Sequence, residues 1–126
     1  MKTVLFFVFL LSIVIQPASA AGVPSRGVAS WYGEAHRGKL MANGKKFNPD
    51  ELTAASWFYP LGTKVRVSLN SDSRTKSSVL VTITDRGPAK RLVNDGRIID
   101  LAHGAFKKLG HPDLGLVGVE VRPVKQ

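Results

Sequence analysis

Residues 63–84 read TKVRVSLNSDSRTKSSVLVTIT and contain the clearest structural pattern of the chain. The first part, 63–69, alternates polar and apolar residues with the period of a half-buried strand. The last part, 78–84, is rich in β-branched residues, which favour strands. The polar segment between them, 70–74, is typical of a turn. We therefore predict an antiparallel hairpin at the centre of a mainly β domain.

Three further stretches have strand character, and two have helical character. The strand candidates are GVASWYG (27–33), RIID (97–100) and VGVEVR (117–122). Five strands in about a hundred residues indicate a small barrel or sandwich. Asn48, Pro49 and Glu51 satisfy the rules for a helix start and predict one or two helical turns at 48–52. Residues 101–109 predict a second helix that ends before Gly110 and packs on the barrel wall through four apolar side chains: Ala102, Ala105, Phe106 and Leu109.

The first twenty residues predict export. Lys2 precedes an uncharged apolar run, 4–15, and Ala18-Ser19-Ala20 follows it. This is the arrangement of a cleaved signal peptide, and the run is shorter than the ~20 residues of a membrane-spanning helix. We expect 1–20 to be a signal peptide cleaved near Ala20, 21–26 a short leader and 27–126 one folded domain. With no cysteine to carry a lipid, we expect a periplasmic or secreted monomer without a membrane anchor.

The charge balance limits the partners of the exported domain. Loss of 1–20 removes Lys2 from the 18 basic residues, so 17 remain against 9 acidic ones, a net charge of +8. Such a surface favours anionic polymers, or it only keeps the domain in solution. Export argues against nucleic acid. No disulfide can form without cysteine, so packing must stabilise the domain.

Asp85 is the candidate for chemistry. It follows an apolar strand in the segment TDRGP (84–88), where the chain must turn. Burial at such an edge raises the pKa of a carboxyl group and suits it to general-acid work. Alternatively, Asp85 is structural and bonds turn amides or pairs with Arg86. His36, His103 and His111 lack metal-ligand spacing, so we expect neither a metal nor a cofactor.

A basic turn and several aromatic side chains are candidates for ligand binding. Residues 42–44 (ANG) predict a turn, and Lys39, Lys45 and Lys46 surround it with positive charge. The aromatic candidates are Trp31, Tyr32, Trp57, Phe58 and Tyr59. They could stack on sugar rings, although in a domain this small we expect most of them to belong to the core.

Six ordered motifs resemble the RlpA-like (rare lipoprotein A) family: GVASWYG (27–33), ANG (42–44), LTAA (52–55), PLGTKVRV (60–67), TDRGP (84–88) and RIIDL (97–101). The resemblance implies a six-stranded double-psi β-barrel with one or two short helices, like that of expansins and barwin. It also implies septal or endolytic lytic transglycosylase activity on peptidoglycan, with stem-stripped strands preferred. In that reaction one acid protonates the oxygen between N-acetylmuramic acid and N-acetylglucosamine, then takes the proton of the C6 hydroxyl to leave a 1,6-anhydro end.

The resemblance places Asp85 on the catalytic aspartate of the family. Two other positions depart from the family pattern, because Lys45 replaces its glutamate and Ser56 its histidine. These changes predict reduced or absent activity. The expected substrate-binding residues are Trp31, Tyr32, Asn43, Gly44, Lys45, Ser56 and Arg86. Two alternatives remain: a non-catalytic, expansin-like barrel that binds peptidoglycan, and an envelope interaction or inhibitor protein.

Overall fold

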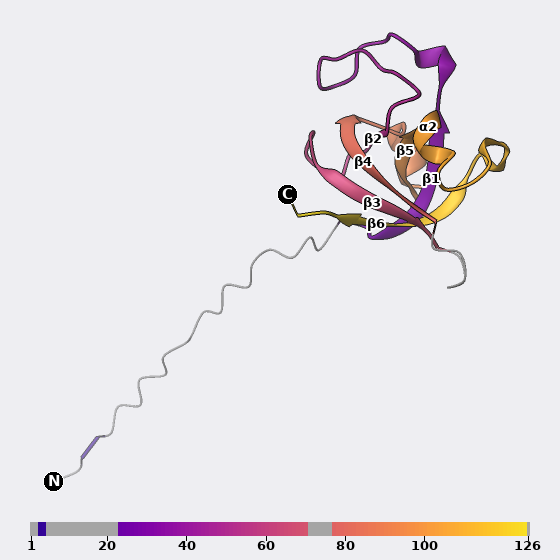
Figure 1. The fold of residues 1–126 in the computed structure, drawn as a ribbon. Helices are drawn as coiled ribbons and strands as arrows, with labels where there is room; N and C mark the ends of the chain where they lie inside the picture. Colours follow the sequence, from indigo (N-terminus) through magenta and orange to yellow (C-terminus); the bar gives the residue numbers. More distant parts are fainter. Residues whose placement is uncertain (1–2, 5–22, 71–76, 126) are drawn as a thin grey trace.

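The structure, a computed structural model, describes residues 3–4, 23–70 and 77–125. The predicted signal peptide, apart from 3–4, the cleavage site near Ala20 and most of the predicted turn 70–74 lie outside the described residues. Six strands close into a barrel in the order β1-β5-β2-β4-β3-β6 (Figure 1). The strands are β1 Arg26–Tyr32, β2 Thr53–Ala55, β3 Lys64–Leu69, β4 Ser78–Asp85, β5 Arg97–Ala102 and β6 Val117–Pro123.

The predicted hairpin is confirmed. β3 and β4 pair antiparallel, with Val65 opposite Val81 and Val67 opposite Val79. These four valines are buried, because alternate side chains of a strand point to one face. β1 pairs with β5 and β2 with β4 in parallel, while the remaining neighbours are antiparallel. The predicted barrel and its other three strands are therefore also confirmed.

The sixth strand, β2, is the one that residue patterns did not predict. It is three residues long and buried throughout, so it is too short to show a period. The helix predicted at 48–52 is wrong, because the chain turns there and enters β2 at once. Asn48 Oδ1 accepts the Asp50 N–H at 2.9 Å, and Glu51 O accepts the Thr53 N–H at 3.0 Å. The cap residues therefore stabilise a turn.

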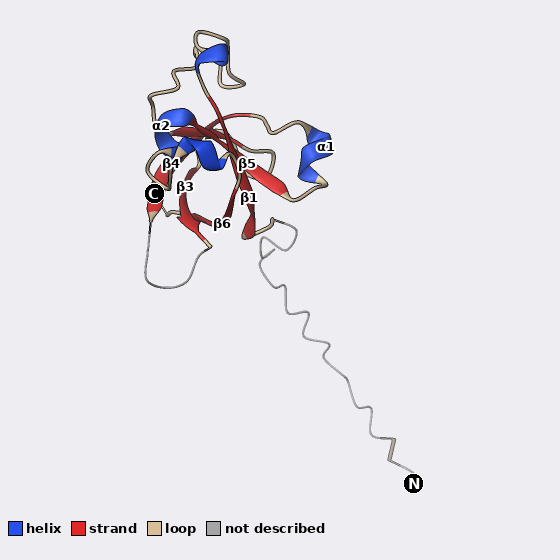
Figure 2. Ribbon diagram, turned by 90° about the vertical axis from the view of Figure 1, so that its right-hand side faces the viewer, coloured by secondary structure: helices blue, strands red, loops and turns tan. Residues whose placement is uncertain are grey.

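Two short α-helices, α1 Lys90–Val93 and α2 His103–Phe106, lie outside the barrel wall (Figure 2). The sequence did not predict α1. The helix predicted at 101–109 begins too early, because Leu101 and Ala102 extend β5 and pair with β1. Its predicted packing is confirmed for three side chains that join the core: Ala105, Phe106 and Leu109. Two 3-10 turns, η1 Glu34–His36 and η2 Pro112–Leu114, complete the described helical structure.

A long loop, residues 33–52, crosses above the barrel (Figure 1). Within it, residues 38–47 fold back on themselves through the Phe47 N–H to Lys39 O bond at 2.8 Å. Met41 and Phe47 are buried in a small apolar cluster with Ala102 of β5. Tyr32 of β1 stacks on Phe47 with ring centroids 4.2 Å apart. The loop is thus fixed to the outer side of β1 and β5.

No described helix has both the length and the apolar character that crossing a membrane requires.

Candidate functional site

Asp85 is the last residue of β4 and binds the long loop. Its Oδ1 accepts N–H bonds from Ala42 and Arg86, each at 2.9 Å. The neighbouring Thr84 O accepts the Asn43 N–H at 3.1 Å. Asp85 thus bonds turn amides, as expected for the structural role that the sequence left open beside a general-acid role. Among the described residues, no hydrogen bond is formed by its Oδ2.

A second aspartate, Asp100, lies in the same row across the barrel wall. Ala55 of β2 is paired with Asp100 on one side and with Asp85 on the other. A register shift between Ala54 and Ala55 brings Asp85, instead of Thr84, opposite Ala55. Irregularities of this kind re-aim side chains next to functional sites. Since Ala54 belongs to the core, its neighbour Ala55 and the paired Asp100 face the outer side beneath the long loop.

Asp100 is a half-buried acid with one hydrogen-bond donor near it. Burial and, to a smaller extent, the negative charge of Asp85 raise the pKa of its carboxyl group, which is about 6. The Ser30 hydroxyl, which donates to Asp100 Oδ1 at 3.2 Å, opposes the shift, as do the charges of His36 and Arg97. Asp100 was not predicted from the sequence. The pattern that could have indicated a half-buried acid is its place between two apolar pairs, Ile98-Ile99 and Leu101-Ala102.

In β1, Ser30 is paired with Asp100, and Tyr32 lies two residues further along the strand, opposite Ala102. The phenol oxygen of Tyr32 is buried and has no hydrogen-bond partner among the described residues. Burial, followed by the charges of Asp85 and Asp100, raises the pKa of the phenol. A buried hydroxyl without a partner carries a free-energy penalty of about 1–3 kcal/mol. Tyr32 therefore offers an unused donor and acceptor close to both carboxyl groups.

Three of the predicted binding residues are engaged within the fold. Arg86 donates to Ser56 O at 2.8 Å and to Tyr59 O at 2.6 Å, and the described residues show no ion pair between it and Asp85. Ser56 is fully buried and bonds Ile98 O and the Phe58 N–H, both at 3.2 Å. Trp31 donates to Pro112 O at 2.9 Å and packs against His103 of α2. These three side chains hold loops and helix α2 against the barrel.

The predicted turn at 42–44 is confirmed and borders a pocket. The Gly44 N–H binds Met41 O at 2.9 Å, and Gly44 has φ of 84°, which suits glycine. Asn43 Oδ1 accepts the Lys45 N–H at 3.0 Å. Lys45 is exposed, and no ion pair joins it to Asp85 in the described part of the chain.

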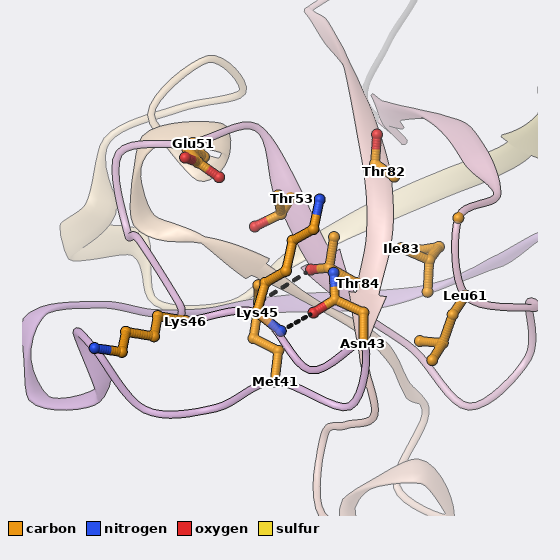
Figure 3. A pocket seen from close by; sticks show the side chains of 11 residues that line it. Met41, Asn43, Lys45, Lys46, Glu51, Thr53, Leu61, Thr82, Ile83 and Thr84 are labelled. Carbon is orange, nitrogen blue, oxygen red and sulfur yellow. Dashed lines mark hydrogen bonds between the residues drawn. The ribbon is translucent and has the colours of Figure 1, made fainter.

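The pocket has a volume of about 620 Å³. Its wall on β2 and β4 is formed by three threonines, Thr53, Thr82 and Thr84. The Lys45 side chain extends across the pocket, and that of Lys46 points away (Figure 3). The Thr53 hydroxyl is buried without a partner among the described residues. Thr53 lies two residues before Ala55, so the pocket is about 7 Å along β2 from the row of carboxyl groups. Asp85 is not among the residues that line the pocket, although its neighbour Thr84 is.

The described residues contain no cluster of three or more histidine, aspartate or glutamate side chains arranged to bind a metal ion. The chemistry that the site offers is that of carboxyl groups and hydroxyls. Asp85, Asp100, Tyr32 and Ser30 come together on the outer face of β1, β5, β2 and β4. Lys45 and Asn43 border the adjacent pocket.

Comparison with known proteins gives consistent matches. A family model described as "Lytic transglycolase" matches residues 24–121. A probable endolytic peptidoglycan transglycosylase RlpA of Synechocystis is 43% identical over 93 residues, which are 74% of this chain and 27% of the relative. The endolytic peptidoglycan transglycosylase RlpA of Vibrio cholerae is 36% identical over 103 residues, 82% of this chain and 36% of the relative. This chain thus spans about a third of these curated relatives.

Solved structures share the fold at low sequence identity. The expansin of Clavibacter michiganensis in complex with cellohexaose has a TM-score of 0.57 at 17% identity, covering 80% of this chain and 50% of the expansin chain. The Streptomyces papain inhibitor has a TM-score of 0.55 at 22% identity, covering 79% of this chain and 96% of the inhibitor. The barrel is therefore a six-stranded double-psi β-barrel, as the motifs implied.

Proposed function

Because this chain belongs to the lytic transglycolase family of double-psi β-barrels, we propose that it is an endolytic lytic transglycosylase of peptidoglycan. The observation that carries the proposal is the row Asp85–Ala55–Asp100 on the outer face of the barrel. Cleavage of a glycosidic bond requires a carboxyl group that can give and take a proton. Asp85 is the acid and base that we assign from the family.

The proposed bond is the one between N-acetylmuramic acid and N-acetylglucosamine, in strands stripped of stem peptides. The acid protonates the glycosidic oxygen as the bond to C1 breaks, and the C6 hydroxyl closes on C1 to give a 1,6-anhydro end. Asn43 and Lys45 border the pocket beside this row, where the next sugar would lie, and Gly44 shapes the turn between them. The amino group of Lys45 suits the lactyl carboxylate of muramic acid.

One assay tests the proposal. The domain, Asp85→Asn and the control Asp113→Asn are incubated with stem-stripped glycan strands, and mass spectrometry detects 1,6-anhydro ends. Asp113 is an exposed residue of η2. We expect product from the parent protein and the control, and a loss of about a hundredfold or more with Asp85→Asn. Absence of product from the parent protein would contradict the proposal.

A second candidate function is glycan binding without cleavage. The departures from the family, Lys45 and Ser56, favour it, and the expansin of this fold was solved with cellohexaose. Co-sedimentation with peptidoglycan sacculi, measured on the same three proteins, separates the two candidates. Binding by a parent protein that makes no product supports the binding function. The papain inhibitor of the same fold represents a third class, which predicts neither product nor binding.

We also propose that the domain works in the periplasm or outside the cell, where peptidoglycan is exposed. Support comes from the signal-like composition of 1–20 and from relatives named for action on peptidoglycan. N-terminal sequencing of the exported protein tests this, with Ala21 expected as the first residue.

A further inference from the structure

We propose that Asp100 is the proton donor of the reaction and that Asp85 is the proton acceptor, so that two carboxyl groups carry out the cleavage. This inference rests on the proposed function and assigns to Asp100 a role that the family motif gave to Asp85 alone. Ser30 and Tyr32 complete the machinery by orienting the donor and by binding the substrate.

The two groups lie in one row of the barrel wall, where Asp85 of β4 and Asp100 of β5 flank Ala55 of β2. Two strand spacings place their backbones about 10 Å apart, and the charge of Asp85 acts on the carboxyl group of Asp100. Pairs of carboxyl groups that act on a sugar from two sides are separated by about 5–9.5 Å. The spacing of the row is therefore compatible with two carboxyl groups that act on one glycosidic bond.

The two aspartates have different surroundings. Asp85 Oδ1 accepts two backbone N–H bonds, from Ala42 and Arg86, whereas Asp100 has one hydroxyl donor, Ser30. Carboxyl groups in unequal surroundings can take the separate roles of acid and base.

The groups that act on Asp100 come from four elements. His36 of η1 and Arg97 of β5 lower its pKa, as does the Ser30 hydroxyl of β1, while Asp85 of β4 and burial raise it. Burial outweighs the others, and the resulting pKa of about 6 leaves Asp100 protonated at weakly acidic pH.

The Tyr32 hydroxyl near the two acids is buried without a partner among the described residues. The charges of both aspartates act on it, so the three groups belong to one site. A buried hydroxyl without a partner carries a free-energy penalty, so a sugar hydroxyl that reached it would gain a hydrogen bond.

The step balances without a further reactant. The Asp100 proton passes to the glycosidic oxygen, the bond between C1 and that oxygen breaks, and N-acetylglucosamine leaves as the alcohol. The C6 oxygen of the muramic residue then bonds to C1, and its proton passes to Asp85. Exchange with water returns the proton from Asp85 to Asp100. The net change is one glycosidic bond broken and one anhydro bond formed.

The test measures 1,6-anhydro product against pH for the parent protein, Asp100→Asn, Ser30→Ala and the control Asp95→Asn, an exposed residue after α1. Because the donor must be protonated, we expect the activity of the parent protein to fall tenfold per pH unit above about pH 6. Asp100→Asn should lose at least a hundredfold at every pH while still binding sacculi. Ser30→Ala removes a bond that lowers the pKa of Asp100, so its activity should persist to higher pH than that of the parent protein.

Carbon-detected NMR of the Asp100 carboxyl group gives a second measurement that needs no turnover. We expect titration near pH 6 in the parent protein, at higher pH in Ser30→Ala and at lower pH in Asp85→Asn, which loses a neighbouring negative charge. Full activity of Asp100→Asn, or titration of Asp100 at its ordinary value in the parent protein, would overturn this inference and leave the proposed function intact. A parent protein without product would overturn both.

Discussion

Replacing Asp100 by asparagine should stabilise the folded protein at neutral pH. Asparagine has nearly the same shape as aspartate, and its Oδ1 can accept the Ser30 bond. It carries no charge, so the burial that opposes an ionised carboxyl group at this position no longer acts. The prediction concerns the free energy of unfolding and is independent of catalysis.

The magnitude follows from the pKa of Asp100, which burial raises from its ordinary value of 3.8 to about 6. Between those pH values the folded chain keeps a proton that the unfolded chain has lost, so stability falls as pH rises from about 4 to about 6. A tenfold change in proton affinity is worth about 1.4 kcal/mol, which sets a ceiling of about 3 kcal/mol. Because Asp100 keeps some contact with solvent, we expect about 1–2 kcal/mol.

Urea unfolding at pH 4, 5, 6, 7 and 8 measures the effect as the difference between Asp100→Asn and the parent protein. The two should be nearly equal at pH 4, and the variant should be about 1–2 kcal/mol more stable at pH 7 and above. Asp95→Asn, at an exposed position, is the control and should differ by less than about 0.5 kcal/mol. A difference that is independent of pH, or a variant less stable than the parent protein at pH 8, would refute the reasoning.

Three further changes test the packing that holds the site. Arg86→Ala leaves the carbonyls of Ser56 and Tyr59 without their donor, so it should lower the free energy of unfolding by about 2–4 kcal/mol. The control Arg91→Ala, on exposed α1, should not lower it. Unchanged stability together with weaker binding to sacculi would instead make Arg86 a ligand residue. Phe106→Ala opens a cavity at a fully buried position and should lose about 3–5 kcal/mol in urea unfolding, against little change for the exposed Leu114→Ala. Gly104→Ala would place a methyl group 2.9 Å from Asp50 O, so the thermal midpoint of this variant should fall. Gly110→Ala meets only the end of the Leu114 side chain, so its midpoint should fall less. Equal midpoints would show that the loop at Asp50 moves to accommodate the methyl group.

The sequence predicted the hairpin and the barrel because their strands are long enough to show a period. The Val65–Val81 and Val67–Val79 pairs follow directly from alternation. Asp85 could be placed at a strand end for the same reason. The family motifs supplied the sixth strand and the double-psi connection, which no local pattern contains.

The remaining features depend on contacts between distant parts of the chain. The cap residues at 48–52 look like a helix start, yet β2 begins at Thr53 and is fixed by its neighbours β4 and β5. Leu101 and Ala102 have helical neighbours, yet pairing with β1 keeps them in β5. The raised pKa of Asp100 comes from burial and from the charge of Asp85, fifteen residues away in the sequence. None of these effects leaves a local signal.

Lys45 and Ser56, the two residues that differ from the family pattern, have different environments in the structure. Lys45 is exposed at the edge of the pocket, so it can meet a ligand. Ser56 is fully buried, and its carbonyl and hydroxyl hold Arg86, Ile98 and Phe58 in place. A change at Ser56 therefore acts on the chemistry through the position of the β4 end, whereas a change at Lys45 acts on the ligand. Under the proposed function, cleavage would depend chiefly on Asp85 and Asp100, which flank Ala55 in one row of the barrel wall.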